Sequence, residues 1–374
     1  MNGTEGIERI PGKKRSYNPN RFNASDSGMV YLIALIVFYG ISLLFGKIFA
    51  EPLRSLYRYD TYAYMIVNIG VSQSAVFLVA FIYSRIRRVN PFCGGGYIAK
   101  FDGVQVLMSI ILIMGIMMTF YHVHLQFSSD AETILGEAFS PDINLSPLSP
   151  VFALIYIAMI CICPAIFEEM LFRGIVMRGL EQFGNVIAVV LSALMFALMH
   201  GNFSQLILQF IGGLAIGGVV MITKNYLSGS VMHAFNNFYS VVYGVLTQKL
   251  GEDLLSSYLQ AVTDAALIVI GVACLVISLI YFGKMLVDKK KREWEGKPPV
   301  NRFDKVKTYK FKENGEPKTA PYYEIAEMRL RGEEDGRTFS ICGKERKLNR
   351  KSACVPAFIV LGLSIFTAIV FMFV

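Results

Sequence analysis

Three groups of polar residues interrupt apolar stretches of this chain, and their side chains are of the types that hydrolytic enzymes use. A charged side chain in hydrocarbon costs about 2.5–3.5 kcal/mol on insertion scales, so such groups persist mainly where they are paired or functional. The chain has only four histidines, and two of them belong to these groups. We therefore predict that the groups form one site. In chain order they are Glu168 and Glu169 with Arg173, Phe196 with His200, and His233 with Asn237.

The first group places two carboxylates side by side on a predicted helix. Glu169 and Arg173 are four residues apart on one helical face, so they can pair within the helix. Glu168 projects about 100° away from Glu169, which frees its carboxylate to act as a general base. The alternative is an ion pair that only fixes the packing of helices.

The second group can meet the first across a helical hairpin. Gly184 marks the predicted turn, 16 residues after Glu168 and 16 residues before His200. In an antiparallel hairpin this symmetry places the two side chains at about the same depth, where they could bind and activate a water molecule between them. The alternative for His200 is a buried ring that is hydrogen-bonded to backbone near Gly201.

The third group provides hydrogen-bond donors. His233 and Asn237 lie on one helical face and can both stabilise the negative charge of a tetrahedral intermediate. A polar pair that holds two membrane helices together is the alternative. Counting helical turns places His233 nearer the cytoplasmic side than His200, and a tilt or a break in the glycine-rich helix between them would be needed to bring them together.

The elements that carry these groups are predicted to be membrane helices. The chain is 54% hydrophobic and 17% charged, with a mean hydropathy of +0.49, and a soluble domain could not expose so much apolar surface. Apolar runs of about 20 residues recur, which is the length that crosses a bilayer. The predicted fold is an all-α, polytopic transmembrane bundle of about nine helices. These cover residues 28–48, 62–84, 104–122, 151–180, 185–200, 204–223, 228–246, 263–286 and 354–374.

Charge predicts the orientation of these helices. Residues 1–27 contain basic residues but no cleavable signal, so we expect a cytoplasmic amino terminus and an external carboxyl terminus. The acidic loop 123–150 then lies outside. Segment 288–351 lies inside and holds 19 Lys or Arg against 12 Asp or Glu, a net charge of +7 out of the chain's formal +8. Such a segment favours anionic lipid as its partner rather than nucleic acid. The pattern favours a bacterial plasma membrane.

We divide the chain accordingly. Residues 1–27 form the cytoplasmic amino-terminal segment, 28–150 the first three helices as accessory packing elements, and 151–246 a four-helix catalytic core. The eighth helix (247–287), the basic segment (288–351) and a terminal helix (352–374) follow. Within the basic segment, residues 306–312 alternate as an exposed strand would and Asn314-Gly315 is a turn signal; residues 322–331 could form a short helix.

The order of the three groups resembles a known family. Glu-Glu-x-x-x-Arg, then Phe-x-x-x-His, then His-x-x-x-Asn on successive membrane helices is similar to the CPBP or Abi family, the intramembrane proteases related to type II CaaX prenyl endopeptidases. The resemblance implies that Glu168 activates water with His200 as its partner and that His233 and Asn237 form the oxyanion site. Glu169, Arg173 and Phe196 would support them. The implied substrate is a membrane-associated peptide or protein, which could be lipidated.

The resemblance leaves the metal question open, since the family is often labelled as metalloproteases. Glu168, His200 and His233 could ligate zinc, but no classical spacing demands it, and we favour chemistry that needs no cofactor. His122 and His124 are expected to pack at a helix end rather than bind metal.

Two other functions fit the same residues. A catalytically silent relative could serve as a membrane scaffold or bacteriocin-immunity protein. A transporter could use Glu168 and His200 as a proton relay, although the chain lacks two halves with broken helices. We favour an endopeptidase that cleaves near the cytoplasmic half of the bilayer.

Overall fold

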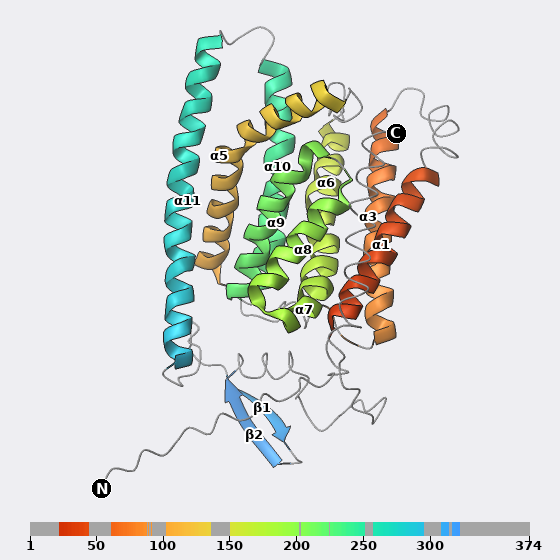
Figure 1. Ribbon diagram of the computed structural model, residues 1–374, viewed down its shortest axis with the longest axis vertical. Helices are drawn as coiled ribbons and strands as arrows, with labels where there is room; N and C mark the ends of the chain where they lie inside the picture. Colours follow the sequence, from red (N-terminus) through yellow and green to blue (C-terminus); the bar gives the residue numbers. More distant parts are fainter. Residues whose placement is uncertain are drawn as a thin grey trace.

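The computed structural model describes a bundle of long helices and one β-hairpin (Figure 1). Described residues are 22–44, 61–91, 102–135, 150–250, 257–294, 308–313 and 316–321, except 88, 90, 202 and 224. Within them, six helical stretches are long and apolar enough to cross a membrane. The prediction of a helical transmembrane bundle is therefore confirmed.

The helices form a central group with a pair on either side. Helices α6 (Pro150–Leu171), α8 (Asn185–Met199), α9 (Phe203–Thr223) and α10 (Tyr226–Leu250) lie in the centre of the view in Figure 1. Helices α1 (Ala24–Leu44) and α3 (Thr61–Arg87) pack together on one side, and α5 (Gly103–Leu135) packs against α11 (Ser257–Trp294) on the other. The central helices carry all three polar groups.

Each predicted span that lies within the described residues coincides with a helix. The six membrane-crossing stretches fall in α1, α3, α5, the α6–α7 region, α9 and α11, whereas α8 is apolar but shorter. Helix α10 is outside that set because it holds the polar third group. The predicted span 354–374, the helix at 322–331 and the segment 1–21 lie outside the described residues.

The predicted helix 151–180 is divided just after the paired carboxylates. Helix α6 ends at Leu171, residues Phe172–Val176 form a π-helical turn, and α7 (Met177–Leu180) and a 3₁₀ turn (Glu181–Phe183) follow. A π turn holds one more residue than an α turn, so it changes the direction of the side chains that follow. Gly184 then reverses the chain with φ of 113°, which favours glycine. The predicted turn at Gly184 is confirmed.

The predicted external loop 123–150 and the structure differ in where the preceding helix ends. Helix α5 continues to Leu135, because hydropathy marks only the part of a helix that lies in the membrane. The amide of Gln126 donates to Asp130 at 2.9 Å, one turn further on, and supports the polar extension. Helix α11 likewise runs past the predicted end at 286, through the basic residues, to Trp294.

The basic segment contains a β-hairpin. Strands β1 (Thr308–Glu313) and β2 (Glu316–Pro321) pair antiparallel, with Glu313 opposite Glu316 across residues 314–315. The strand predicted over residues 306–312 corresponds to β1, and its pairing with β2 is an addition that the sequence pattern did not predict. The two strands lie apart from the helices in Figure 1.

Candidate active site

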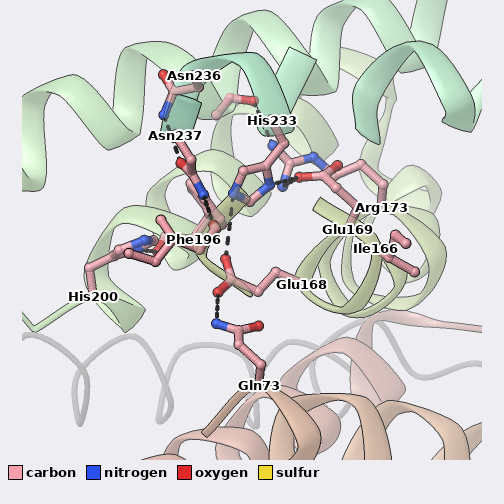
Figure 2. Close-up of polar contacts among 12 residues, drawn as sticks. Gln73, Ile166, Glu168, Glu169, Arg173, Phe196, His200, His233, Asn236 and Asn237 are labelled. Atoms are coloured by element: carbon pink, nitrogen blue, oxygen red, sulfur yellow. Dashed lines mark hydrogen bonds and ion pairs between the residues drawn. The ribbon is translucent and has the colours of Figure 1, made fainter. Parts of the chain in front are cut away.

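The three polar groups meet between the central helices, and Figure 2 shows their contacts. Glu168 and Glu169 lie near the end of α6, and Arg173 lies in the π turn that follows. Helix α8 carries Phe196 and ends beside His200, while α10 carries His233 and Asn237. The hairpin at Gly184 thus brings the first two groups together, and α10 closes the arrangement.

Glu169, Arg173 and His233 form a buried ion cluster. Glu169 Oε1 lies 3.2 Å from Arg173 Nη1 and 2.9 Å from His233 Nδ1. The Glu169 and Arg173 side chains are fully buried. Because a carboxylate is an acceptor, His233 Nδ1 carries the hydrogen of this bond, and the ring presents Nε2 to the rest of the site. The predicted pairing of Glu169 with Arg173 within the helix is confirmed.

The guanidinium of Arg173 is held on three sides. Besides Glu169, it donates from Nη2 to the carbonyl oxygen of Gly213 on α9 at 3.2 Å. Its central carbon lies 5.1 Å from the centre of the Phe196 ring, which adds a cation–π contact. Gly213 also packs closely on α8, since a Cβ there would lie 3.2 Å from Ala193 and 3.4 Å from the Phe196 ring. Phe196 therefore supports the cluster by covering Arg173.

Glu168 lies between α3 and the His233 ring of this cluster. Its Oε1 accepts a 2.6 Å hydrogen bond from Gln73 Nε2, and its Oε2 lies 3.8 Å from His233 Nε2. Its side chain is 12% exposed, whereas that of Glu169 is completely enclosed. The adjacent carboxylates therefore face different surroundings, in agreement with the helical geometry (Figure 2).

Gln73 is the site residue that sequence reasoning missed. The sequence predicts helices one to three as ordinary packing elements, and the structure adds that α3 donates a hydrogen bond to Glu168 through Gln73. Gln73 is buried in an apolar helix next to two serines, Ser72 and Ser74. A buried polar residue in such a helix was the available signal, but the sequence does not show which neighbour it faces.

His200 lies one turn beyond Phe196 and keeps to its own helix end. Its Nδ1 is 2.9 Å from the carbonyl oxygen of Phe196, and its ring packs edge-on to the Phe196 ring at 4.8 Å between centres. A carbonyl accepts, so Nδ1 carries the hydrogen and Nε2 can accept another. Within the described residues, no hydrogen bond or ion pair joins His200 to Glu168, so the predicted water site between them stays a prediction.

Asn237 contacts a backbone carbonyl on α6 that a proline leaves without its usual helical hydrogen bond. Pro164 lacks the N–H that would bond the carbonyl oxygen of Ile160 in a regular helix. The Asn237 Nδ2 donates to that oxygen at 2.9 Å, and its own Oδ1 accepts from Asn236 Nδ2 at 3.2 Å. The predicted helix-joining role is thus present in the geometry. An amide nitrogen has two hydrogens, and the bond to Ile160 uses only one of them.

The difference in depth that turn counting predicts between His200 and His233 is small in the structure. The Phe196 ring lies 4.8 Å from the His200 ring and 5.5 Å from the His233 ring, so both rings contact the same phenyl group. Helix α9 between them is continuous from Phe203 to Thr223. A break in α9 is therefore not what brings them together.

The described residues do not gather three donors suited to a metal ion. In the hypothetical zinc set, Glu168 Oε2 and His233 Nε2 lie 3.8 Å apart, and within the described part of the chain His200 does not join them in a group that could hold a metal ion. His124 packs against the Tyr121 ring at 5.6 Å between centres. The side chain of His122 lies outside the described part of the chain. The described side chains of Glu168, His200 and His233 therefore do not form a zinc site in this arrangement.

Comparison with known families adds an independent result. Residues 150–239 match the family model described as type II CAAX prenyl endopeptidase Rce1-like. The match begins with α6 and ends just after Asn237, so it contains all three polar groups. The search of curated proteins returned no match for the chain.

Proposed function

Through residues 150–239 the chain belongs to the CPBP family of membrane-embedded CaaX-type proteases, and from that premise we propose that it is an endopeptidase acting on a membrane-associated protein or peptide. One observation carries the proposal: two adjacent carboxylates have opposite surroundings. Glu169 is enclosed and paired with Arg173 and His233, whereas Glu168 is partly exposed with no cation as close. The surroundings of Glu169 suit a structural ion pair. Those of Glu168 leave its carboxylate able to act as a base.

Glu168 is the general base of this mechanism. Its carboxylate takes a proton from a water molecule while the water oxygen bonds to the carbonyl carbon of the scissile peptide. The resulting tetrahedral intermediate then collapses as the C–N bond breaks, and the Glu168 carboxyl group returns the proton to the leaving amine nitrogen. Atoms and charge balance without a further reactant.

His200 is the partner that orients the water. Its Nδ1 is occupied by the Phe196 carbonyl, so Nε2 is the ring atom available to accept the second hydrogen of the water. The bond to a backbone carbonyl fixes the tautomer that this role requires.

His233 and Asn237 stabilise the oxyanion. The imidazolium form of His233 carries a hydrogen on each ring nitrogen, and the Nδ1 hydrogen is directed to Glu169. In that form Nε2 bears an N–H that can donate to the developing oxyanion, together with the second N–H of Asn237 Nδ2. This mechanism uses no metal ion, so we expect cleavage to continue when metal ions are removed with a chelator.

The substrate class follows from the family description and the bundle. We infer a peptide bond near the membrane surface in a substrate that reaches the site from the bilayer, with a prenylated CaaX-type sequence as the leading choice. The basic segment 288–351 would hold the cytoplasmic face against anionic lipid.

Peptide termini test the function even while the substrate is unidentified. Membranes and medium from cells that carry wild type, Glu168→Ala or His200→Ala at equal abundance are compared by mass spectrometry. Termini present with wild type and absent with both variants are expected. Identical termini in all three would instead support a scaffold or immunity protein, and altered ion-coupled uptake would support a transporter.

A further inference from the structure

We propose that Gln73 is a positioning residue for Glu168: its amide fixes Oε1 of the carboxylate and leaves Oε2 to take the proton from water. This inference rests on the proposed function and deepens it. Gln73 comes from α3, which lies outside the segment 150–239 that matches the family model. The accessory helices would then contribute directly to the site.

Gln73 and Glu168 form a short hydrogen bond. Gln73 Nε2 lies 2.6 Å from Glu168 Oε1, and a hydrogen bond to an ionised acceptor is short and strong. The other oxygen, Oε2, is the one that faces His233 Nε2. Gln73 therefore assigns different roles to two oxygens that would otherwise exchange by rotation of the carboxylate.

A glutamine at position 73 costs free energy in its buried surroundings. Its side chain is buried, and its Oε1 is buried without a hydrogen-bond partner among the described residues. An apolar side chain of the same size would avoid that unpaired acceptor. Among the described residues the one hydrogen bond of the Gln73 side chain goes to Glu168, so that contact is what the glutamine provides.

Helix α3 packs against α6 on both sides of Gln73. At Gly70, one turn before, the end of the Met159 side chain of α6 packs on α3, with its Cε 2.9 Å from where a Cβ would lie. Phe77, one turn after, packs on the Phe167 ring at 4.8 Å between centres. These contacts lie on the same helical face as Gln73. The amide is thus held against Glu168 by packing on either side.

The test compares variants of Gln73 in the full-length protein. Vesicles from cells expressing wild type, Gln73→Met, Gln73→Glu or Glu168→Gln at equal abundance are incubated at pH 5.5 and pH 8, and the rate of formation of new peptide termini is measured. Ser74→Met is the matched control, because Ser74 is the exposed neighbour of Gln73 on α3.

Gln73→Met removes the donor, and we expect the rate to fall about tenfold or more at both pH values, against less than about twofold for Ser74→Met. Gln73→Glu places two carboxyl groups in hydrogen-bond contact. It should be silent at pH 8 and regain activity at pH 5.5, where one shared proton restores a donor to Glu168. Loss of packing alone would not produce that recovery.

Two outcomes are kept distinct. If Glu168→Gln is silent while Gln73→Met cleaves within about twofold of wild type, the role of Gln73 is refuted and the proposed function stands. A Gln73→Glu variant equally inactive at both pH values would also overturn the positioning role. If Glu168→Gln forms the same termini as wild type, the proposed function itself fails.

Discussion

The two sides of the site hold their charges in different ways. On the enclosed side, the buried ion cluster joins Glu169, Arg173 and His233. The Phe196 ring and the backbone of α9 contact its Arg173. On the open side, Glu168 has a neutral amide as its nearest partner and keeps part of its surface accessible. Neighbouring residues of one type thus separate into a structural and a chemical role.

The difference shows what a helix can do with consecutive carboxylates. Successive side chains point about 100° apart, so Glu169 turns to Arg173 and α10 while Glu168 turns to α3. The π turn directly after α6 holds Arg173 in the enclosed side. The end of α6 thus positions both carboxylates. We expect that Glu168 and Glu169 can be mutated separately, each with its own effect.

Glu169→Gln is expected to have the largest effect on stability. It leaves the fully buried Arg173 without its carboxylate, and breaking one partner of a buried pair costs about 3–5 kcal/mol. The thermal midpoint of the detergent-solubilised protein should fall sharply. Glu168→Gln is the matched control and should change the midpoint little, and an equal loss in both variants would erase the proposed difference between the two sides.

A neutral replacement of the whole pair sharpens the same point. Replacing a buried ion pair by uncharged side chains of similar volume is often nearly neutral. The double variant Glu169→Gln, Arg173→Met should therefore recover about 1–3 kcal/mol relative to Glu169→Gln alone. Unfolding measurements on the four members of this cycle give the coupling, and purely additive losses would show that the pair does not act as a unit.

Asn237→Ala is expected to cost about 1–3 kcal/mol, because it leaves the Ile160 carbonyl unpaired beside Pro164. In a Pro164→Ala background the new backbone N–H can bond that carbonyl, so the cost of losing Asn237 should shrink by about 1 kcal/mol. Unfolding of both single variants and the double variant tests this. If Asn237→Ala costs the same free energy in both backgrounds, the stabilising effect of Asn237 does not come from its bond to the Ile160 carbonyl.

Gly229→Ala should have the smallest effect of the set. A Cβ at Gly229 would meet Val220 Cγ2 at 2.6 Å near the Glu169 carboxylate, whereas one at Gly218 would meet nothing within 4 Å. We expect a loss of about 1 kcal/mol or somewhat more for Gly229→Ala and a neutral or slightly stabilising effect for Gly218→Ala. A thermal shift assay compares them, and a tolerated Gly229→Ala would mean that the enclosed side can relax.

Much of the site could be predicted because its residues are anomalies in an apolar sequence. Glu169 and Arg173 follow helical spacing, and the Gly184 turn follows from the break between two apolar runs. Gln73 could not be placed, because a single helix shows its polar face but not the helix that this face meets. The π turn at Phe172–Val176 was also missed, since no spacing of side chains marks a backbone that gains one residue per turn.

The fold shows the same division. Hydropathy predicts the membrane part of α5 but not its continuation to Leu135, where hydrogen bonds such as that from Gln126 to Asp130 take over in a polar sequence. Strand β1 was predictable because alternation is a local signal, whereas its pairing with β2 was not predicted. Local patterns therefore predict elements, while contacts between distant helices need the structure.

The most direct test measures peptide cleavage and thermal unfolding together for Glu168→Gln and Glu169→Gln in the same membranes. The expected result is that Glu168→Gln loses all wild-type peptide termini and keeps the wild-type midpoint, while Glu169→Gln lowers the midpoint strongly. A Glu168→Gln protein that still produces those termini would contradict the assignment of Glu168 as the base.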